Sequence, residues 1–478
     1  MSRSPAIDRR AVVVKLFSSA GNAMPHYNTS PKLLTLLSLW LLCGGLLSAC
    51  RSQPSETPAP SAASASSPST PTKTDESPAD RAIRTADSGV AAQPQQSERY
   101  VALASAYMQK ARESGDASYY QRAEAAVQRA LELDSGSAAA LRTLAWVQTG
   151  KHEFRAALAA AERLRQQFPQ DPLVHGLLGD AALELGDYAR AETAFQAMLD
   201  LRPGLPSFSR AAYLRELYGD REGAVELMEQ AVKSGSVRDP EPLAWCLVQL
   251  GQLYFNQGRL GKAETAFTNA LAVFPQYYQA VAALGRVRGA QLRYPEAIAL
   301  YRQAVAITPT PDLLAALGDL LLVTGKPEEA ERQFVLVEYI EQVNATNQVA
   351  YTRQLALFYA DHDRKLDEAV TLAEAEIQRR HDIYSFDTLA WAYYKKGRFA
   401  DARQAMTQAL RLGTQDAQLL FHAGMIARAL DEPEKAKEYL SRALETNPYF
   451  SLRDGDVARK VLAGLGQHLI ARGEGHGR

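Results

Sequence analysis

The sequence predicts an all-α protein in which about ten copies of one helix–turn–helix unit stack into a solenoid. The first observation is an alanine that recurs from residue 123 onwards at spacings of 33, 34 or 39 residues. The series is Ala123, Ala157, Ala191, Ala224, Ala263, Ala297, Ala330, Ala369, Ala402 and Ala436. A recurrence at this length is typical of repeat architectures, in which each unit buries its apolar face against the next.

Other residue types recur at fixed distances from this alanine. Twelve residues before it lies a small residue such as Gly179 or Gly251, and four residues after it often lies a bulky one such as Phe195 or Phe267. Two helices approach closely only where a side chain is small, and the bulky side chain fills the space beside that contact. A proline often follows twelve residues after the alanine and ends the second helix, because proline lacks an amide donor. Each repeat is therefore predicted to be two closely packed helices.

With this period and these positions, residues 100–451 resemble the tetratricopeptide repeat (TPR) family, whose repeat is about 34 residues long. The resemblance implies a TPR α-solenoid wound into a right-handed superhelix. It also implies that the first helix of each repeat lines a concave groove that binds partners. Solenoid repeats contact only their neighbours, so the curvature is expected to change where a joint between repeats is longer than usual.

The N-terminal segment 1–49 has the pattern of a bacterial signal peptide. An apolar run from Leu33 ends in Leu47-Ser48-Ala49-Cys50, which resembles the bacterial lipobox. The resemblance implies cleavage before Cys50 and attachment of lipid to its thiol. The run is shorter than the roughly 20 apolar residues that span a membrane. An uncleaved membrane anchor remains the alternative, and Met24 is an alternative start to Met1.

Residues 50–97 are predicted to be the lipidated cysteine followed by a disordered tether. Ser, Pro, Ala and Thr dominate this segment, and such a composition cannot bury enough apolar surface to offset chain entropy. A flexible chain of this length has a mean reach of roughly 35–40 Å. Residue 51 is Arg and not Asp, and by resemblance to enterobacterial lipoproteins this favours the outer over the inner membrane.

Two 39-residue spacings divide the repeats into three groups, at 98–236 (repeats 1–4), 237–343 (repeats 5–7) and 344–452 (repeats 8–10). The first long joint lies in a Gly/Ser/Pro-rich loop near residues 233–241, and the second is expected to be a lengthened helix near 338–347. Residues 453–472 are predicted to form a capping helix, because Val457, Val461, Leu462, Leu465 and Leu469 share one helical face. Residues 473–478 are predicted to be a disordered tail.

Charge and cysteine content exclude several function classes. The first 49 residues carry +4 of a total formal charge of −1, which leaves −5 on the mature chain, so no nucleic-acid partner is expected. Cys246 is the one cysteine left after Cys43 and Cys50, and its helical apolar surroundings predict a buried hydrophobe. The sequence has no phosphate-binding loop, zinc-ligand spacing or nucleophile elbow. We therefore expect no enzyme activity, no cofactor and no metal.

The family resemblance assigns residues to the concave groove by their offset from the small residue of each first helix. The assigned groove residues are Arg142, Trp146, Tyr213, Trp245, Gln252, Phe255, Arg286, Arg353, Asp387, Trp391, Tyr394, Phe421 and Arg428. All three tryptophans of the mature chain are among them. Trp, Tyr and Arg are enriched at binding hot spots, so the groove is expected to bind an extended peptide or a partner helix.

Together these features predict a lipid-anchored, periplasm-facing scaffold of the bacterial cell envelope. Its partners would be proteins or peptides of an envelope assembly, secretion or export system, and its membrane contact would be the lipid on Cys50. The alternative is a periplasmic factor that binds glycan or peptidoglycan, with the aromatic groove residues stacking on sugars.

Overall fold

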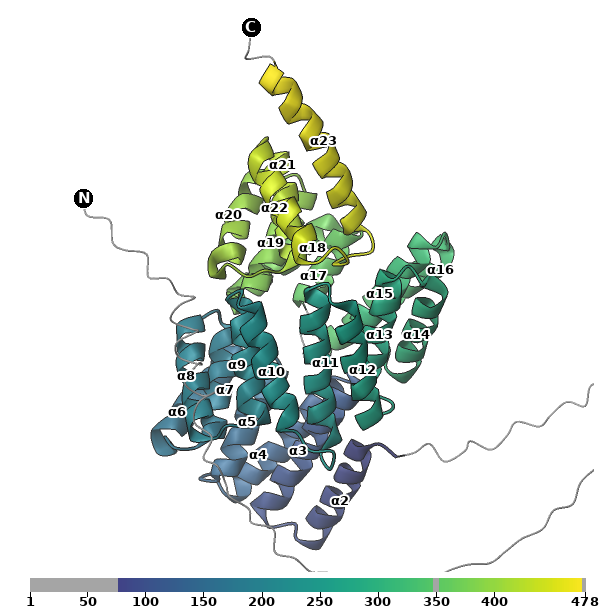
Figure 1. Ribbon diagram of the computed structural model, residues 1–478. Helices are drawn as coiled ribbons and strands as arrows, with labels where there is room; N and C mark the ends of the chain where they lie inside the picture. Colours follow the sequence, from purple (N-terminus) through teal and green to yellow (C-terminus); the bar gives the residue numbers. More distant parts are fainter. Residues whose placement is uncertain (1–75, 347–351, 475–478) are drawn as a thin grey trace, which may run out of the picture.

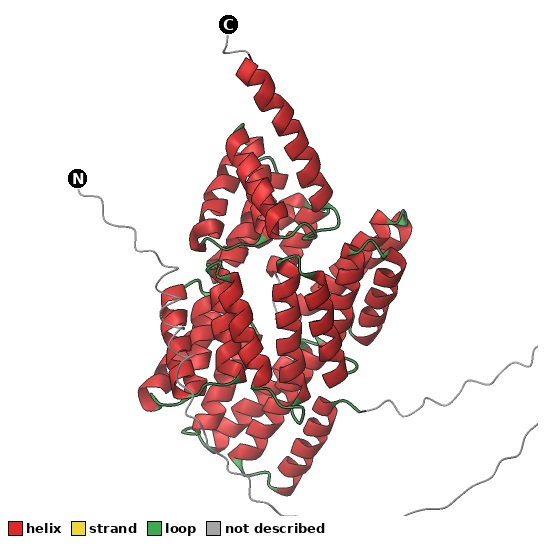
Figure 2. Cartoon of the chain, viewed as in Figure 1, coloured by secondary structure: helices red, strands yellow, loops and turns green. Residues whose placement is uncertain are grey.

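The computed structural model describes residues 76–346 and 352–474, and this part of the chain is helical throughout, with 22 α-helices and no strand (Figure 2). The predicted all-α repeat fold is confirmed. The signal segment, Cys50 and residues 51–75 of the predicted tether lie outside the described residues. Within those residues no helix is both long enough and apolar enough to cross a membrane.

Ten helix pairs follow one another in the predicted order. Repeats 1–4 are α3 (Ser97–Ser114) with α4 (Ser118–Leu133), α5 (Ala138–Gly150) with α6 (Phe154–Gln167), α7 (Pro172–Glu184) with α8 (Tyr188–Leu201), and α9 (Leu205–Leu217) with α10 (Arg221–Lys233). Repeats 5–7 are α11 (Pro240–Asn256) with α12 (Leu260–Val273), α13 (Tyr278–Ala290) with α14 (Tyr294–Ile307), and α15 (Pro311–Val323) with α16 (Pro327–Thr346). Repeats 8–10 are α17 (Thr352–Asp361) with α18 (Leu366–Arg379), α19 (Ile383–Lys395) with α20 (Phe399–Ala409), and α21 (Ala417–Ala429) with α22 (Pro433–Thr446).

The packing inside each pair follows the predicted register. All ten register alanines are at most 1 % exposed. A Cβ added at Gly251 would collide with the ring of Phe267, and one added at Gly318 would collide with the ring of Phe334. The small residue of the first helix therefore leaves the space that the bulky residue of the second helix fills.

Both long joints contain extra structure. Between α10 and α11 the chain has a six-residue connection, residues 234–239, and α11 is 17 residues long where most first helices have 13. Helix α16 is 20 residues long, which confirms the expected lengthened helix.

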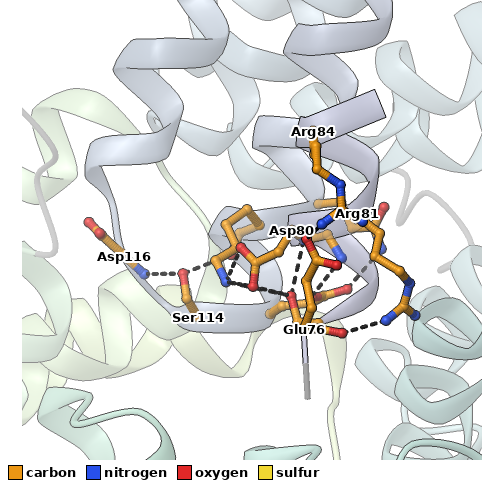
Figure 3. Close-up of polar contacts among 11 residues, drawn as sticks. Glu76, Asp80, Arg81, Arg84, Ser114 and Asp116 are labelled. Atoms are coloured by element: carbon orange, nitrogen blue, oxygen red, sulfur yellow. Dashed lines mark hydrogen bonds and ion pairs between the residues drawn. The ribbon is translucent and has the colours of Figure 1, made fainter. Parts of the chain in front are cut away.

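The predicted tether contains a helix that the composition did not suggest. Helix α2 (Pro78–Ala92) begins with Ser77 as N-cap and Pro78 in the first turn. Asp80 pairs with Lys110 of α3 at 2.7 Å, and the amide of Ala79 donates to Glu113 at 3.2 Å. Figure 3 shows these polar contacts at the start of α2 beside the end of α3. The prediction of disorder up to residue 97 is therefore wrong from residue 78 onwards.

An apolar stripe explains why α2 folds. Ala79 is buried, and the side chains that pack on the core of repeat 1 are Ile83, Ala86 and Val90. These residues recur at helical spacing on one face, so their pattern outweighs the overall low hydrophobicity of the segment.

The capping helix α23 (Asp454–Glu474) projects from the end of the array (Figure 1). Ala458 is buried, and Val461, Leu462 and Leu465 pack against the core. Val457 was expected on the same packed face, but it is 38 % exposed. The side chain of Leu469 lies outside the described residues.

The array folds back on itself, so distant repeats contact one another. Figure 1 shows α17–α23 as a group lying across the ends of α8–α11. One seam joins repeats 2–3 to the α18–α19 turn: Arg380 Nη1 lies 2.7 Å from Glu184 Oε2, and the Ile383 amide donates to the Tyr188 hydroxyl at 2.9 Å. Arg155 adds a hydrogen bond to the Gln378 carbonyl at 2.9 Å. The rule that repeats contact only their neighbours does not hold here.

A second seam is made by the α22–α23 connection, residues 447–453. Arg286 of α13 donates to the Phe450 carbonyl at 3.3 Å, and Arg453 donates to Asp319 of α15 at 3.0 Å. Leu452 lies against Gly289, where an added Cβ would be 3.4 Å from its Cδ2. The connection thus crosses the first helices of repeats 6 and 7, and the concave side becomes a set of bounded hollows.

Candidate functional site

A hollow of about 970 Å³ lies on the concave side of repeats 5–7. We call it the central hollow. Its walls are α11, α13 and α15, the α3–α4 turn of repeat 1 lies at its edge, and α16 and α17 contribute side chains. The α3–α4 turn reaches it because Gly115 packs against Thr308 and Thr310 of repeat 7. Volumes of this size are typical of ligand-binding sites.

Three of the predicted groove residues meet in the central hollow. Trp245 and Gln252 lie on α11, and Arg286 lies on α13. Gln252 donates to Asn256 at 2.7 Å, which fixes its side chain on α11. The three residues come from two adjacent first helices, as the family register implies.

Arg286 links the central hollow to a second one, because it lines both. Its guanidinium carbon lies 4.2 Å from the centre of the Phe255 ring, a cation–π distance. Burial lowers the pKa of Arg286. Phe255 itself is buried beneath this arginine and does not line either hollow.

The second hollow has a volume of about 380 Å³ and lies between repeats 6–7 and repeats 8–10. Trp391, Tyr394 and Phe421 line it. Trp391 is held on both sides, since its ring stacks on Tyr394 at 4.8 Å and on His422 at 4.1 Å. Its indole N–H donates to Asp361 at 2.8 Å. Trp391 is therefore mainly a packed residue that shows one edge to the hollow.

A third hollow of about 180 Å³ holds two further predicted residues, Tyr213 and Arg353. It lies beside the seam of repeats 2–3 with the α18–α19 turn, since Glu184 and Arg380 also line it. Burial raises the pKa of Tyr213 well above its usual range. This hollow is small and strongly charged.

Five predicted groove residues, Phe255 among them, do not line any of these hollows. Arg142 forms an ion pair with Asp171 of the next repeat. Trp146 is half-buried, with the Arg112 guanidinium 5.1 Å from its ring centre. Asp387 is buried and lies 2.9 Å from His422 Nδ1. Arg428 is exposed on α21.

Sequence reasoning missed the aromatic and charged residues that complete the central hollow. These residues include Tyr120, Tyr277, Tyr278, Tyr301, Arg112, Glu241 and Asp312. Arg112 of repeat 1 pairs with Glu241 of repeat 5 at 3.1 Å. No pattern in the sequence pairs repeats 1 and 5, although the adjacent Tyr277 and Tyr278 at the start of a first helix were a visible signal.

Cys246 does not line any of the three hollows. Cys246 is fully buried on α11, as predicted, and burial raises the pKa of its thiol to about 12. Within the described residues, no group of three or more His, Cys, Asp and Glu side chains is arranged to hold a metal ion. The central hollow offers aromatic rings for stacking, hydrogen-bonding groups, the guanidinium groups of Arg112 and Arg286, and carboxylates.

Comparison with known proteins gives a match to the family model of the tetratricopeptide repeat at residues 142–206, 248–312, 283–345 and 388–449. The human protein O-mannosyl-transferase TMTC1 is 26 % identical over 220 residues, which are 45 % of this chain and 24 % of that protein. This chain thus matches about a quarter of the length of that relative.

Two solved structures are similar at low sequence identity. Yeast Tom70 is 14 % identical with a TM-score of 0.37, and the match covers 82 % of this chain and 93 % of that one. A thermophilic TPR protein from Thermus thermophilus is 23 % identical with a TM-score of 0.30, covering 33 % of this chain and 84 % of that one.

Proposed function

Since the chain is a tetratricopeptide-repeat protein, and such repeats bind protein partners, we propose that it is a lipid-anchored scaffold of the bacterial cell envelope. Its partners would bind in the central hollow and belong to an envelope assembly, secretion or export system. The observation that carries the proposal is the meeting of Trp245, Gln252 and Arg286 in a hollow of about 970 Å³. Aromatic and arginine side chains in a partly closed site are typical of binding hot spots.

The envelope location is supported by the lipobox-like sequence Leu47-Ser48-Ala49-Cys50, and Arg51 favours the outer membrane. A lipid anchor on Cys50 would hold the repeat array, and a partner bound to it, close to the membrane. Cys50→Ala should accumulate an unprocessed or mislocalised precursor, while Cys43→Ala in the same segment should not. Normal processing and membrane retention of Cys50→Ala would contradict the lipid anchor.

Partner binding in the central hollow is tested by crosslinking in cells, followed by purification and mass spectrometry. Trp245→Ala should lose the partners that the wild-type chain captures. Leu292→Ala is the matched control, because Leu292 is 70 % exposed and lies outside the three hollows. Equal partner sets for wild type and Trp245→Ala would contradict binding at this hollow.

We propose that the chain has no catalytic activity of its own. The human relative is named as an O-mannosyl-transferase, but the match spans only 24 % of that protein. The proposal is that the shared part is a binding module. Mannosyl transfer by the purified chain would overturn it.

A second candidate function is glycan binding, and the aromatic lining of the central hollow favours it. Tyr120, Trp245, Tyr278 and Tyr301 line this hollow beside amide side chains such as Gln252. Such rings can stack on sugars. Peptidoglycan fragments should then quench the fluorescence of Trp245, and the quenching should be absent in Trp245→Phe. No response to the fragments would leave the peptide site as the sole candidate.

A further inference from the structure

Arg286 is a half-buried arginine with few polar partners. It lies between the central and second hollows, on the ninth residue of α13. A guanidinium has five N–H donors, and the hydrogen bond found for this one is to the Phe450 carbonyl at 3.3 Å. Among the described residues, no carboxylate lies within ion-pair distance of Arg286.

Several other arginines that are buried or half-buried in this protein have acidic partners. Arg210 makes two hydrogen bonds to Asp180, at 2.8 and 2.7 Å. Arg380 lies among Glu184, Glu376 and Asp382. Removing a charge from water is costly unless a partner compensates it. Arg286 has the Phe255 ring and one carbonyl in place of a carboxylate, so its charge is only partly compensated.

Two of the acids that line the central hollow lie at its far end from Arg286. Glu241 and Asp312 occupy the first turns of α11 and α15. Arg286 is eight residues beyond the first residue of the parallel first helix α13, which corresponds to about 12 Å along the axis. Glu241 is also paired with Arg112 at 3.1 Å. Glu241 and Asp312 thus lie well away from Arg286 along the helix axes, and neither pairs with it.

We propose that Arg286 is an anchor for a carboxylate of the bound partner, with the adjoining part of that partner lying against Trp245. The guanidinium would replace its missing acidic partner with the carboxylate, in the bidentate geometry that arginine favours. The inference names the chemistry of the ligand at the proposed protein-binding site and rests on that function. The carboxylate can come from an acidic side chain of the partner or from its C-terminus.

The stability test separates a binding arginine from a structural one. Arg286→Met keeps the length of the side chain and removes a charge that no carboxylate compensates, so the melting temperature should fall by less than in the control. Arg210→Met is the matched control and should lower it, because Asp180 loses its partner. A fall for Arg286→Met as large as that for Arg210→Met would overturn the proposal.

The binding test uses the purified full chain and three short peptides, followed by tryptophan fluorescence. Acetyl-tetraglutamate amide supplies side-chain carboxylates, acetyl-tetraalanine with a free terminus supplies one terminal carboxylate, and acetyl-tetraglutamine amide is the neutral control. At least one carboxylate peptide should bind about tenfold tighter than the neutral one, because a hydrogen bond to a charged group is being added. Arg286→Met should abolish this difference.

The outcomes distinguish the carboxylate anchor at Arg286 from the scaffold function. The carboxylate peptide that binds tighter identifies the source of the group. No preference over the neutral peptide would overturn the anchor. If cells show partners that Arg286→Met captures as well as wild type, the anchor fails and the scaffold function stands. If the peptide preference is present but cells yield no partner, the scaffold function fails and the anchor stands.

Discussion

Arg380 and Glu184 are 196 residues apart in the sequence, yet Arg380 Nη1 lies 2.7 Å from Glu184 Oε2. Arg380 follows α18 and Glu184 ends α7, so this pair joins repeat 8 to repeat 3. Glu376 and Asp382 lie beside the same guanidinium, and Tyr188 receives a hydrogen bond from the Ile383 amide at 2.9 Å. This contact joins repeats that are distant in the sequence, so the array folds back on itself and encloses hollows on its inner side.

Arg380→Met should lower the free energy of unfolding by about 3–5 kcal/mol, because it leaves several buried carboxylates without their cation. Urea unfolding measures the change. The control is Arg190→Ala, which removes an exposed pair with Glu162 at 2.6 Å and should cost less than about 1 kcal/mol. Similar losses for the two variants would show that the seam of Arg380 does not stabilise the fold.

Stability should fall as the pH rises from about 4.5 to about 7 because of Glu216. Burial raises the pKa of Glu216 from 4.5 to about 7, although a hydrogen bond from Asn256 opposes the rise. In this interval the folded state binds the proton more tightly than the unfolded state, so deprotonation favours unfolding. Glu216→Gln should remove this part of the pH dependence and be more stable than wild type at pH 8, but not at pH 4. Urea midpoints that run parallel for both proteins across this range would contradict the prediction.

Gly251→Ala and Gly261→Ala should change stability in opposite directions. A methyl group at Gly251 collides with the Phe267 ring, so overpacking should cost about 1–3 kcal/mol. A methyl group at Gly261 in α12 meets nothing within 4 Å, so the second change should stabilise by about 0.4–1 kcal/mol. Thermal unfolding of both variants gives the comparison. Equal effects would mean that the helix-pair contact is not where the register places it.

Arg453→Gln should loosen the α22–α23 connection without unfolding the repeats. Arg453 donates to Asp319 at 3.0 Å and to the Asp361 carbonyl at 3.2 Å, and it holds the connection on repeats 7 and 8. Hydrogen exchange of residues 447–453 should become faster in this variant. Arg459→Gln is the control, because Arg459 pairs with Asp456 in an exposed position on α23, which follows the connection. Unchanged exchange in Arg453→Gln would show that other contacts hold the connection.

The repeat fold could be predicted because its determinants are local and periodic. Ala263 and Gly251 lie in one repeat, and their spacing specifies how α11 meets α12. The folding back could not be predicted, because it depends on single contacts between distant turns. Gly186, with φ of 76°, leaves room for the carbonyl of His381, and nothing in the sequence connects the two positions.

The candidate site was predicted in part for the same reason. Trp245, Gln252 and Arg286 follow from the register alone and lie together in the central hollow. Tyr120 and Arg112 reach this hollow from repeat 1, so only the tertiary structure reveals them. Trp391 occupies a groove position of its repeat, but its ring is packed between Tyr394 and His422. The C-terminal repeats bury that part of the concave side.

The most direct test of partner binding in the central hollow is a photo-crosslinking amino acid at Gln252, compared with one at Asn269. Gln252 lines the hollow on α11, and Asn269 is exposed on α12 of the same repeat. The account predicts that the probe at position 252 crosslinks to a partner in cells and that the probe at position 269 does not. Crosslinks to the same partner from position 269 alone would contradict binding in the hollow.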